Sequence, residues 1–274
     1  MFIYLQNPTM SGELAVFTDW LFEMWAWQYF RVVILMVVLW LIYLCIKNAA
    51  LVDFGWVCNY FLLGCGLFAL VADSQNYKFY LFFALLVAWA SRLGGYLLLT
   101  RICREHKDPR YEKISEEKTN KALYFFINYQ LQGFLATICA STLYFTFRRP
   151  DYNNIYTIVI GSLITAIGVI GEAISDQQLW NYKNRIDKPR GTIFQEGLWK
   201  KSRHPNLFFE LMVWFGFAIT GINDNGIEVL GFLGPTVLWA IMNFLTIPIS
   251  EKHMYDTRPD YPDFVRRTNK FLPV

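Results

Sequence analysis

The sequence carries little charge and few residues that commonly bind metals. Charged residues make up only 17% of the 274 residues, and the formal net charge of +3 gives no reason to expect a nucleic-acid partner. The three histidines lack H-E-x-x-H spacing and belong to no Cys/His cluster, which argues against a metal site. The chain also has no G-x-S-x-G elbow and no phosphate-binding P-loop, so neither a serine hydrolase nor a P-loop nucleotidase is indicated. The five cysteines form no C-x-x-C pair and mostly lie in apolar runs, as is typical of buried thiols rather than of a disulfide scaffold.

Apolar residues, in contrast, are abundant. Hydrophobic residues make up 55% of the chain and aromatic residues 18%, with a mean hydropathy of +0.27. A soluble domain has too little interior for so many apolar side chains, whereas runs of about 20 apolar residues suit membrane helices. The sequence therefore predicts an all-α, polytopic membrane protein with seven transmembrane helices. The predicted spans are Tyr29–Ile46, Leu51–Ala72, Phe79–Thr100, Tyr124–Phe147, Ile155–Leu179, Asn206–Gly221 and Val229–Ile249.

The distribution of positive charge predicts how the helices are oriented. Arg101–Lys121 and Lys183–Arg203 each hold seven Lys and Arg, the tail Lys252–Lys270 holds five, and Lys47 lies in the first turn. Cytoplasmic connections collect such residues. We therefore expect the N-terminus outside and the C-terminus in the cytoplasm, in a bacterial inner membrane or the endoplasmic reticulum membrane.

The N-terminal residues 1–28 have a different character from the rest. They are rich in aromatic residues, which favour the headgroup level of a bilayer. This composition predicts an interfacial segment. The chain has no basic start of a signal peptide, and we treat it as mature. With no internal repeat and no linker, residues 29–274 are expected to form one membrane domain.

Several ionisable residues fall inside the predicted spans, where they are costly unless they face a partner or a wet cavity. Glu172, Asp176 and Lys183 lie on one face of the fifth span. With Asp53, Arg92 and Glu210 they suggest a polar cavity open to the cytoplasm. The alternative is a structural stripe that packs against Arg92 or Arg203.

Arg203, His204 and Pro205 precede the sixth span. Proline suits the first position of a helix, so Arg203 and His204 should lie at a helix N-terminus, a natural anion site. Asn206 and Glu210, four residues apart, would then point along one helix face into the cavity. The alternative for His204 is a plain capping residue.

The C-terminal tail from Ser250 is short, polar and aromatic. Either it is a solvated end, or it folds back over the basic mouth of the cavity. In the second case Arg258 and Tyr261 are the side chains most able to touch a phosphate or stack on a ring.

These motifs together resemble the membrane steroid 5-alpha-reductase superfamily, which includes sterol reductases and isoprenylcysteine carboxyl methyltransferases, and most closely its bacterial-type branch. The matching segments are L-V-D-F-G-W at 51–56, W-A-S-R-L at 89–93, D-P-R-Y at 108–111, S-D-Q-Q-L at 175–179, G-L-W-K-K-S-R-H-P-N at 197–206 with Glu210 and Trp214, Glu251, and R-P-D-Y at 258–261. The pattern departs at Leu207, where the family usually has Tyr, and at Phe209, where Gly is common.

The resemblance implies a seven-helix fold that binds NADPH. The residues matching the reductases' cofactor site are Asp176, Lys183, Asn206 and Glu210, with a cytoplasmic arginine and tyrosine near the C-terminus covering it. Asp53 falls near the catalytic acid of the reductases, and their catalytic tyrosine falls near Trp89, so Tyr96 is the candidate substitute.

The residues and the resemblance lead to one expected function, an NADPH-dependent reductase of an activated C=C bond in a steroid-like or other lipophilic enone. We expect Asp53 and Tyr96 to be catalytic. The expected cofactor-binding residues are Glu172, Asp176, Lys183, Arg203, His204, Asn206, Glu210, Arg258 and Tyr261.

Two alternatives remain. One is an S-adenosylmethionine-dependent lipid or prenyl-protein methyltransferase, and the other is a non-enzymatic transporter or binding protein. The expected partners are the lipophilic substrate and membrane lipids, with no nucleic acid and no obligatory protein partner.

Overall fold

The structure is a computed structural model that describes Thr18, Phe22 and residues 27–72, 76–103, 118–147, 154–187, 191–222 and 227–274. The interfacial segment expected over residues 1–28 lies almost entirely outside this part, as does most of the basic connection after Arg101. Within the described residues the fold is all-helical, as predicted. The longer helices are α2 (Tyr29–Ile46), α3 (Leu51–Val71), α4 (Tyr77–Leu97), α6 (Lys121–Phe147), α7 (Ile155–Lys183) and α9 (Pro205–Thr220).

The last predicted span is a series of short helical pieces. A 3₁₀ segment at Ile227–Phe232 leads into α10 (Leu233–Ile241), then a π-helical turn at Met242–Thr246, then α11 (Ile247–Thr257). Two short helices complete the fold, α8 (Leu198–Lys201) before α9 and α12 (Tyr261–Arg267) after α11.

Among the described residues, five helical segments are long and apolar enough to cross a membrane. They are Tyr29–Ile46, Leu51–Val71, Tyr77–Ile102, Ile155–Lys183 and Glu228–Thr257. The other two predicted spans are also helical, but α9 has only 16 residues. Helix α6 has 27 residues, and its amide side chains at Asn128, Gln130 and Gln132 lower its hydropathy.

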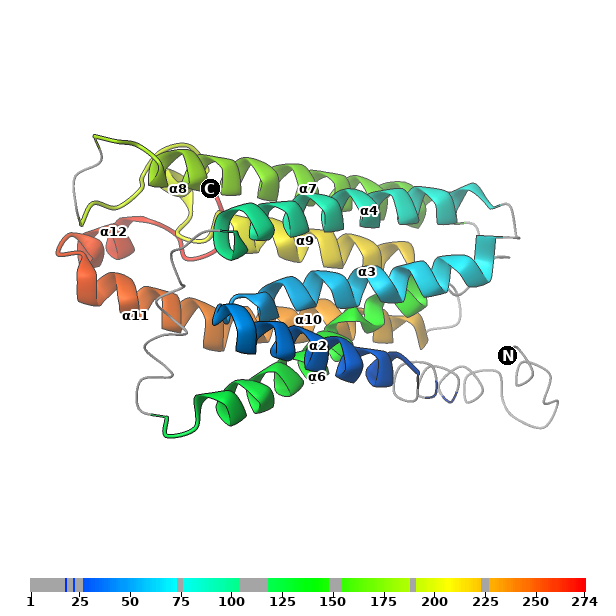
Figure 1. Cartoon of the computed structure of the whole chain (residues 1–274). Coiled ribbons are helices and arrows are strands. Elements are labelled where there is room, and N and C mark those ends of the chain that lie inside the picture. The colour runs from blue at the N-terminus through cyan, green and yellow to red at the C-terminus, as the bar shows by residue number, and fades with distance from the viewer. Residues whose placement is uncertain are drawn as a thin grey trace.

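The helices run side by side, and several connections gather at one end of the bundle. The ends of α4 and α7, the start of α9, and α8, α11 and α12 all lie there (Figure 1). These are the connections in which the sequence concentrates Lys and Arg, so the positive charge of the described residues is mostly found at this end.

Helices α7 and α9 make the closest pair, and glycines explain why. A Cβ on Gly168 would lie 2.7 Å from Val213 N, and one on Gly216 would lie 2.6 Å from Thr165 N. Small residues let membrane helices approach to backbone contact. This contact fixes the register of the two helices that carry most of the predicted cofactor residues.

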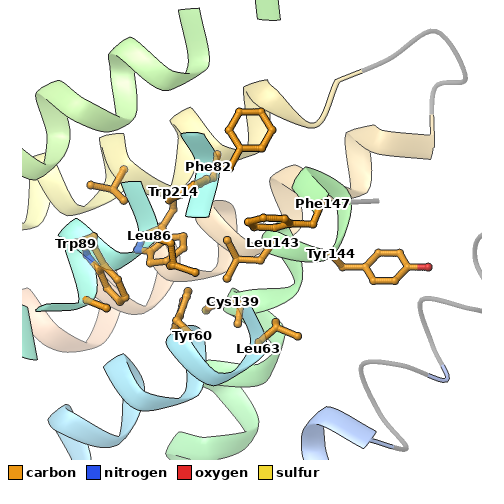
Figure 2. Close-up of a cluster of buried hydrophobic side chains, with 14 of the residues drawn as sticks. Tyr60, Leu63, Phe82, Leu86, Trp89, Cys139, Leu143, Tyr144, Phe147 and Trp214 are labelled. Atoms are coloured by element: carbon orange, nitrogen blue, oxygen red, sulfur yellow. The ribbon is translucent and has the colours of Figure 1, made fainter. Parts of the chain in front are cut away.

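The main core lies between α3, α4, α6, α9 and α10 and is built largely from aromatic rings. Trp89 and Trp214 are fully buried, with ring centroids 4.7 Å apart and nearly perpendicular planes. Tyr60 of α3 lies beside both, 4.2 Å from Trp214 (Figure 2). This core borders the polar residues described next and holds them in place.

Candidate functional site

The carboxylates of α7 meet Arg92, the one arginine of α4. Glu172 and Asp176 are 3% and 4% exposed, and both form ion pairs with Arg92. The Arg92 Nη1–Asp176 Oδ2 distance is 2.7 Å. The polar stripe on α7 therefore does pack against Arg92, as one of the two sequence interpretations held. Burial removes these charges from water, so each depends on its partner.

Helix α9 adds an amide and a third carboxylate to this group. Asn206 Nδ2 donates to Asp176 Oδ1 at 3.3 Å. Glu210 lies against Glu172 and accepts hydrogen bonds from Trp89 Nε1 at 2.9 Å and Trp214 Nε1 at 2.7 Å. Asn206 and Glu210 thus point along one face toward α7, as their spacing predicts.

These contacts form a cluster that contains more carboxyl groups than basic groups. Three carboxyl groups, of Glu172, Asp176 and Glu210, surround the guanidinium of Arg92. Within the described part of the chain, Arg92 Nε is buried and has no hydrogen-bond acceptor. We call these four residues and Asn206 the Arg92 cluster.

Of the two predicted catalytic residues, Tyr96 interacts electrostatically with this cluster, and Asp53 is connected to it through Arg101. Asp53, in the first turn of α3, forms an ion pair with Arg101 beyond the end of α4. Tyr96 lies within electrostatic range of Arg92, Arg101 and Asp176. Arg101 also interacts electrostatically with Asp176. Asp53, Arg101, Tyr96 and the Arg92 cluster therefore form one continuous polar tract.

The predicted anion site at the start of α9 has a different arrangement. Pro205 begins the helix as expected, and His204 is buried just before it. Arg203 Nε donates to Glu251 Oε1 at 2.8 Å, and His204 Nε2 lies 3.0 Å from the same oxygen. Arg203 Nη1 also donates to the carbonyl of Thr268 at 2.8 Å. The side chains of Arg203 and His204 are therefore already paired with groups of the protein itself, the Glu251 carboxylate and the Thr268 carbonyl.

The C-terminal tail folds back onto the start of α9, where Ser202 and Arg203 donate to the carbonyls of Phe271 and Thr268. That it covers the mouth of a cavity stays a prediction. Tyr261 is buried at the start of α12, where desolvation raises the pKa of its phenol and Glu251 adds to the effect. We call Arg203, His204, Glu251 and Tyr261 the Glu251 cluster. It joins α9, α11 and α12 at one end of the bundle.

The remaining two predicted cofactor residues belong to neither cluster. Lys183 is exposed in the last turn of α7, and Arg258 Nη1 donates to the carbonyl of Thr192 at 2.9 Å. The predicted site residues therefore fall into a buried acidic group, a tail-anchoring group and two outlying cations.

The model of a family described as "Protein of unknown function (DUF1295)" matches residues 39–268, most of the chain. The chain belongs to this family. The DUF1295 family falls within the steroid 5-alpha-reductase-like group, which supports the broader resemblance read from the motifs. No match was found among the curated proteins or the solved structures that were compared.

Two residues of this DUF1295 chain that sequence reasoning left out of the site have a clear place in it. Trp89 donates a hydrogen bond to one carboxylate oxygen of Glu210, and the Glu251 carboxylate forms hydrogen bonds with Arg203 and His204. Trp89 lies near the position where the resemblance places a tyrosine, and that departure from the family pattern was the available signal. Glu251 was visible only as part of the motif, because its partners lie almost 50 residues earlier in the chain.

Proposed function

We propose that this protein is a membrane-embedded, NADPH-dependent reductase of an activated C=C bond in a steroid-like or other lipophilic enone. The observation that carries the proposal is the buried polar tract, in which Tyr96 and the Arg92 cluster lie together among membrane helices. Buried, paired ionisable groups in a membrane interior usually mark a functional site.

The proposed topology has seven spans, with α6 and α9 added to the five long apolar segments. The N-terminus lies outside and the bundle end that carries α8, α11 and α12 lies in the cytoplasm. The clustering of Lys and Arg at that end supports this orientation. The membrane is a bacterial inner membrane or that of the endoplasmic reticulum.

The side chains of the Arg92 cluster fit the nicotinamide end of NADPH. An amide ligand needs both donors and acceptors, which Asn206 and Glu210 supply, and Arg92 Nε is a buried donor without an acceptor. Lys183, two turns beyond Asp176 on α7, and Arg258 would face the phosphates. Bound NADPH would supply the hydride.

The chain's own part in the reaction is to hold and deliver a proton. We assign proton delivery to Tyr96, which lies within electrostatic range of both Arg92 and Arg101. Asp53 fixes Arg101 through its ion pair and so acts as a positioning residue. The aromatic core around Trp89 keeps water from the inner side of the tract.

One observation favours the second candidate, an S-adenosylmethionine-dependent methyltransferase. Arg203 and His204, the centre of the predicted anion site, are paired with Glu251. That pairing leaves fewer cations for a dinucleotide with several phosphates, whereas S-adenosylmethionine carries none.

A titration of the purified chain in nanodiscs separates the two candidates. We expect isothermal calorimetry to show NADPH binding more tightly than NADH or S-adenosylmethionine. Binding of S-adenosylmethionine without binding of NADPH would reverse the assignment. A screen of lipophilic enones for loss of NADPH absorbance would then identify the substrate class.

A further inference from the structure

The outer side of the α7/α9 pair carries a groove of about 540 Å³. None of the predicted site residues lines it, so it is a second feature of the same two helices. Its walls are apolar and one end carries a cation. The residues that matter here are Ile167, Ile170 and Ile174 of α7, Phe209 of α9, and Leu198 and Lys201 of α8.

The groove is closed off from the Arg92 cluster. A Cβ on Gly171 would lie 2.3 Å from Phe209 Cδ1, so the phenylalanine ring lies directly on the α7 backbone. Glu172 and Asp176 point to the other side of α7, toward Arg92. A molecule in the groove therefore cannot reach the proposed reaction site without separating the two helices.

The apolar walls face the region where lipid would lie. Ile170 is 60% exposed and Ile167 is 52% exposed, on a helix long and apolar enough to cross a membrane. Side chains with this exposure on a spanning helix pack against hydrocarbon chains. The shape of the groove gives one such chain a defined position.

The short helix α8 fixes the backbone position of Lys201 at the end of the groove. The Leu198 N–H donates to Gln178 Oε1 at 3.0 Å, and Trp199 Nε1 donates to the carbonyl of Ser175 at 2.9 Å. Gly197, with φ of 57°, makes the preceding turn, and a Cβ there would lie 2.5 Å from Gln178. Helix α8 is thus fixed to α7, and Lys201 lines the groove where the apolar wall ends.

We propose that this groove binds a phospholipid with an anionic headgroup, with an acyl chain along the α7 isoleucines and the phosphate at Lys201. Charge and shape together select this ligand. A lipid with no net charge gains less from this lysine, because its own ammonium group offsets its phosphate, and a free phosphate gains nothing from the apolar trough. Lys201 lies at the bundle end where positive charge collects, which is where headgroups of an anionic leaflet would lie.

Native mass spectrometry of the full chain in detergent, with added phosphatidylglycerol or phosphatidylcholine, tests the headgroup. We expect phosphatidylglycerol to bind more tightly, and Lys201→Ala to weaken it about fivefold, the usual contribution of one lysine near an anionic lipid. The matched control is Lys200→Ala, an exposed lysine one residue away that does not line the groove. Equal binding of the two lipids, or equal losses in the two variants, would overturn the proposal.

A second pair of variants tests the apolar trough. Ile170→Trp fills the groove and should reduce bound phosphatidylglycerol at least as much as Lys201→Ala. Leu41→Trp adds the same ring to an exposed position on α2, outside the groove, and should have no effect. Unchanged binding in Ile170→Trp, with the variant folded by circular dichroism, would show that the lipid lies elsewhere and would refute the proposal.

Discussion

The Arg92 cluster and the Glu251 cluster are both built around a partly buried arginine, yet their charge balance differs. Arg92 faces three carboxyl groups, whereas Arg203 and His204 share the one carboxylate of Glu251. The Arg92 cluster has three carboxyl groups for a single guanidinium, so it offers hydrogen-bond acceptors to a ligand. In the Glu251 cluster, Arg203 also bonds to a main-chain carbonyl, so its donors are used internally. The comparison indicates that the Arg92 cluster is suited to a ligand and that the Glu251 cluster is suited to anchoring the tail.

The largest expected effect comes from removing the one base of the acidic cluster. Arg92→Met leaves the two buried carboxyl groups of Glu172 and Asp176 without their partner, so we expect a loss of about 3–5 kcal/mol in unfolding free energy. Thermal unfolding in detergent measures it. Arg92→Lys keeps the charge but loses the forked geometry of the guanidinium. Its unfolding free energy should lie between those of the parent and Arg92→Met. A melting temperature for Arg92→Met equal to that of the parent would contradict the description of this cluster.

A smaller and more local effect is expected at the end of the bundle. Glu251→Gln weakens the bonds of Arg203 and His204, and a charged hydrogen bond of this kind contributes about 2 kcal/mol. The tail should therefore be cut faster in limited proteolysis while the bundle stays folded. The exposed pair Arg185–Glu196 offers the control, because Glu196→Gln should leave the cleavage rate unchanged. Equal rates for Glu251→Gln and the parent would show that the tail is held by other contacts.

The smallest expected effect concerns alkaline pH. Burial raises the pKa of Tyr261 above its ordinary value of 10.0. Its neutral form is favoured in the folded protein, so its contribution to stability is present below about pH 10 and is lost as the pH rises further. Tyr261→Phe should make docking of the tail less sensitive to pH above 10. The exposed Tyr255→Phe is the control, and the same alkaline proteolysis profile in all three proteins would remove Tyr261 from the account.

The sequence predicts the Arg92 cluster better than the Glu251 cluster, because different physical constraints determine their contacts. A charge inside a membrane helix must face a partner or a wet cavity, so the packing of Glu172 and Asp176 against Arg92 could be foreseen as one of two interpretations. The start of α9 at Pro205 also follows from local chemistry. The choice of Glu251 as the partner of Arg203 depends on how α11 packs against α9, and neither spacing nor hydropathy encodes that contact. The short 3₁₀ and π segments around α10 depend on packing in the same way.

The most direct test compares the two clusters as ligand sites. NADPH affinity would be measured by calorimetry in nanodiscs for the parent, Glu210→Gln and Glu251→Gln. The account predicts that Glu210→Gln weakens binding about tenfold, as expected for a lost charged hydrogen bond, and that Glu251→Gln changes it less than about twofold. Stronger binding in Glu251→Gln, with no change in Glu210→Gln, would place the anion site at Arg203 and contradict the account.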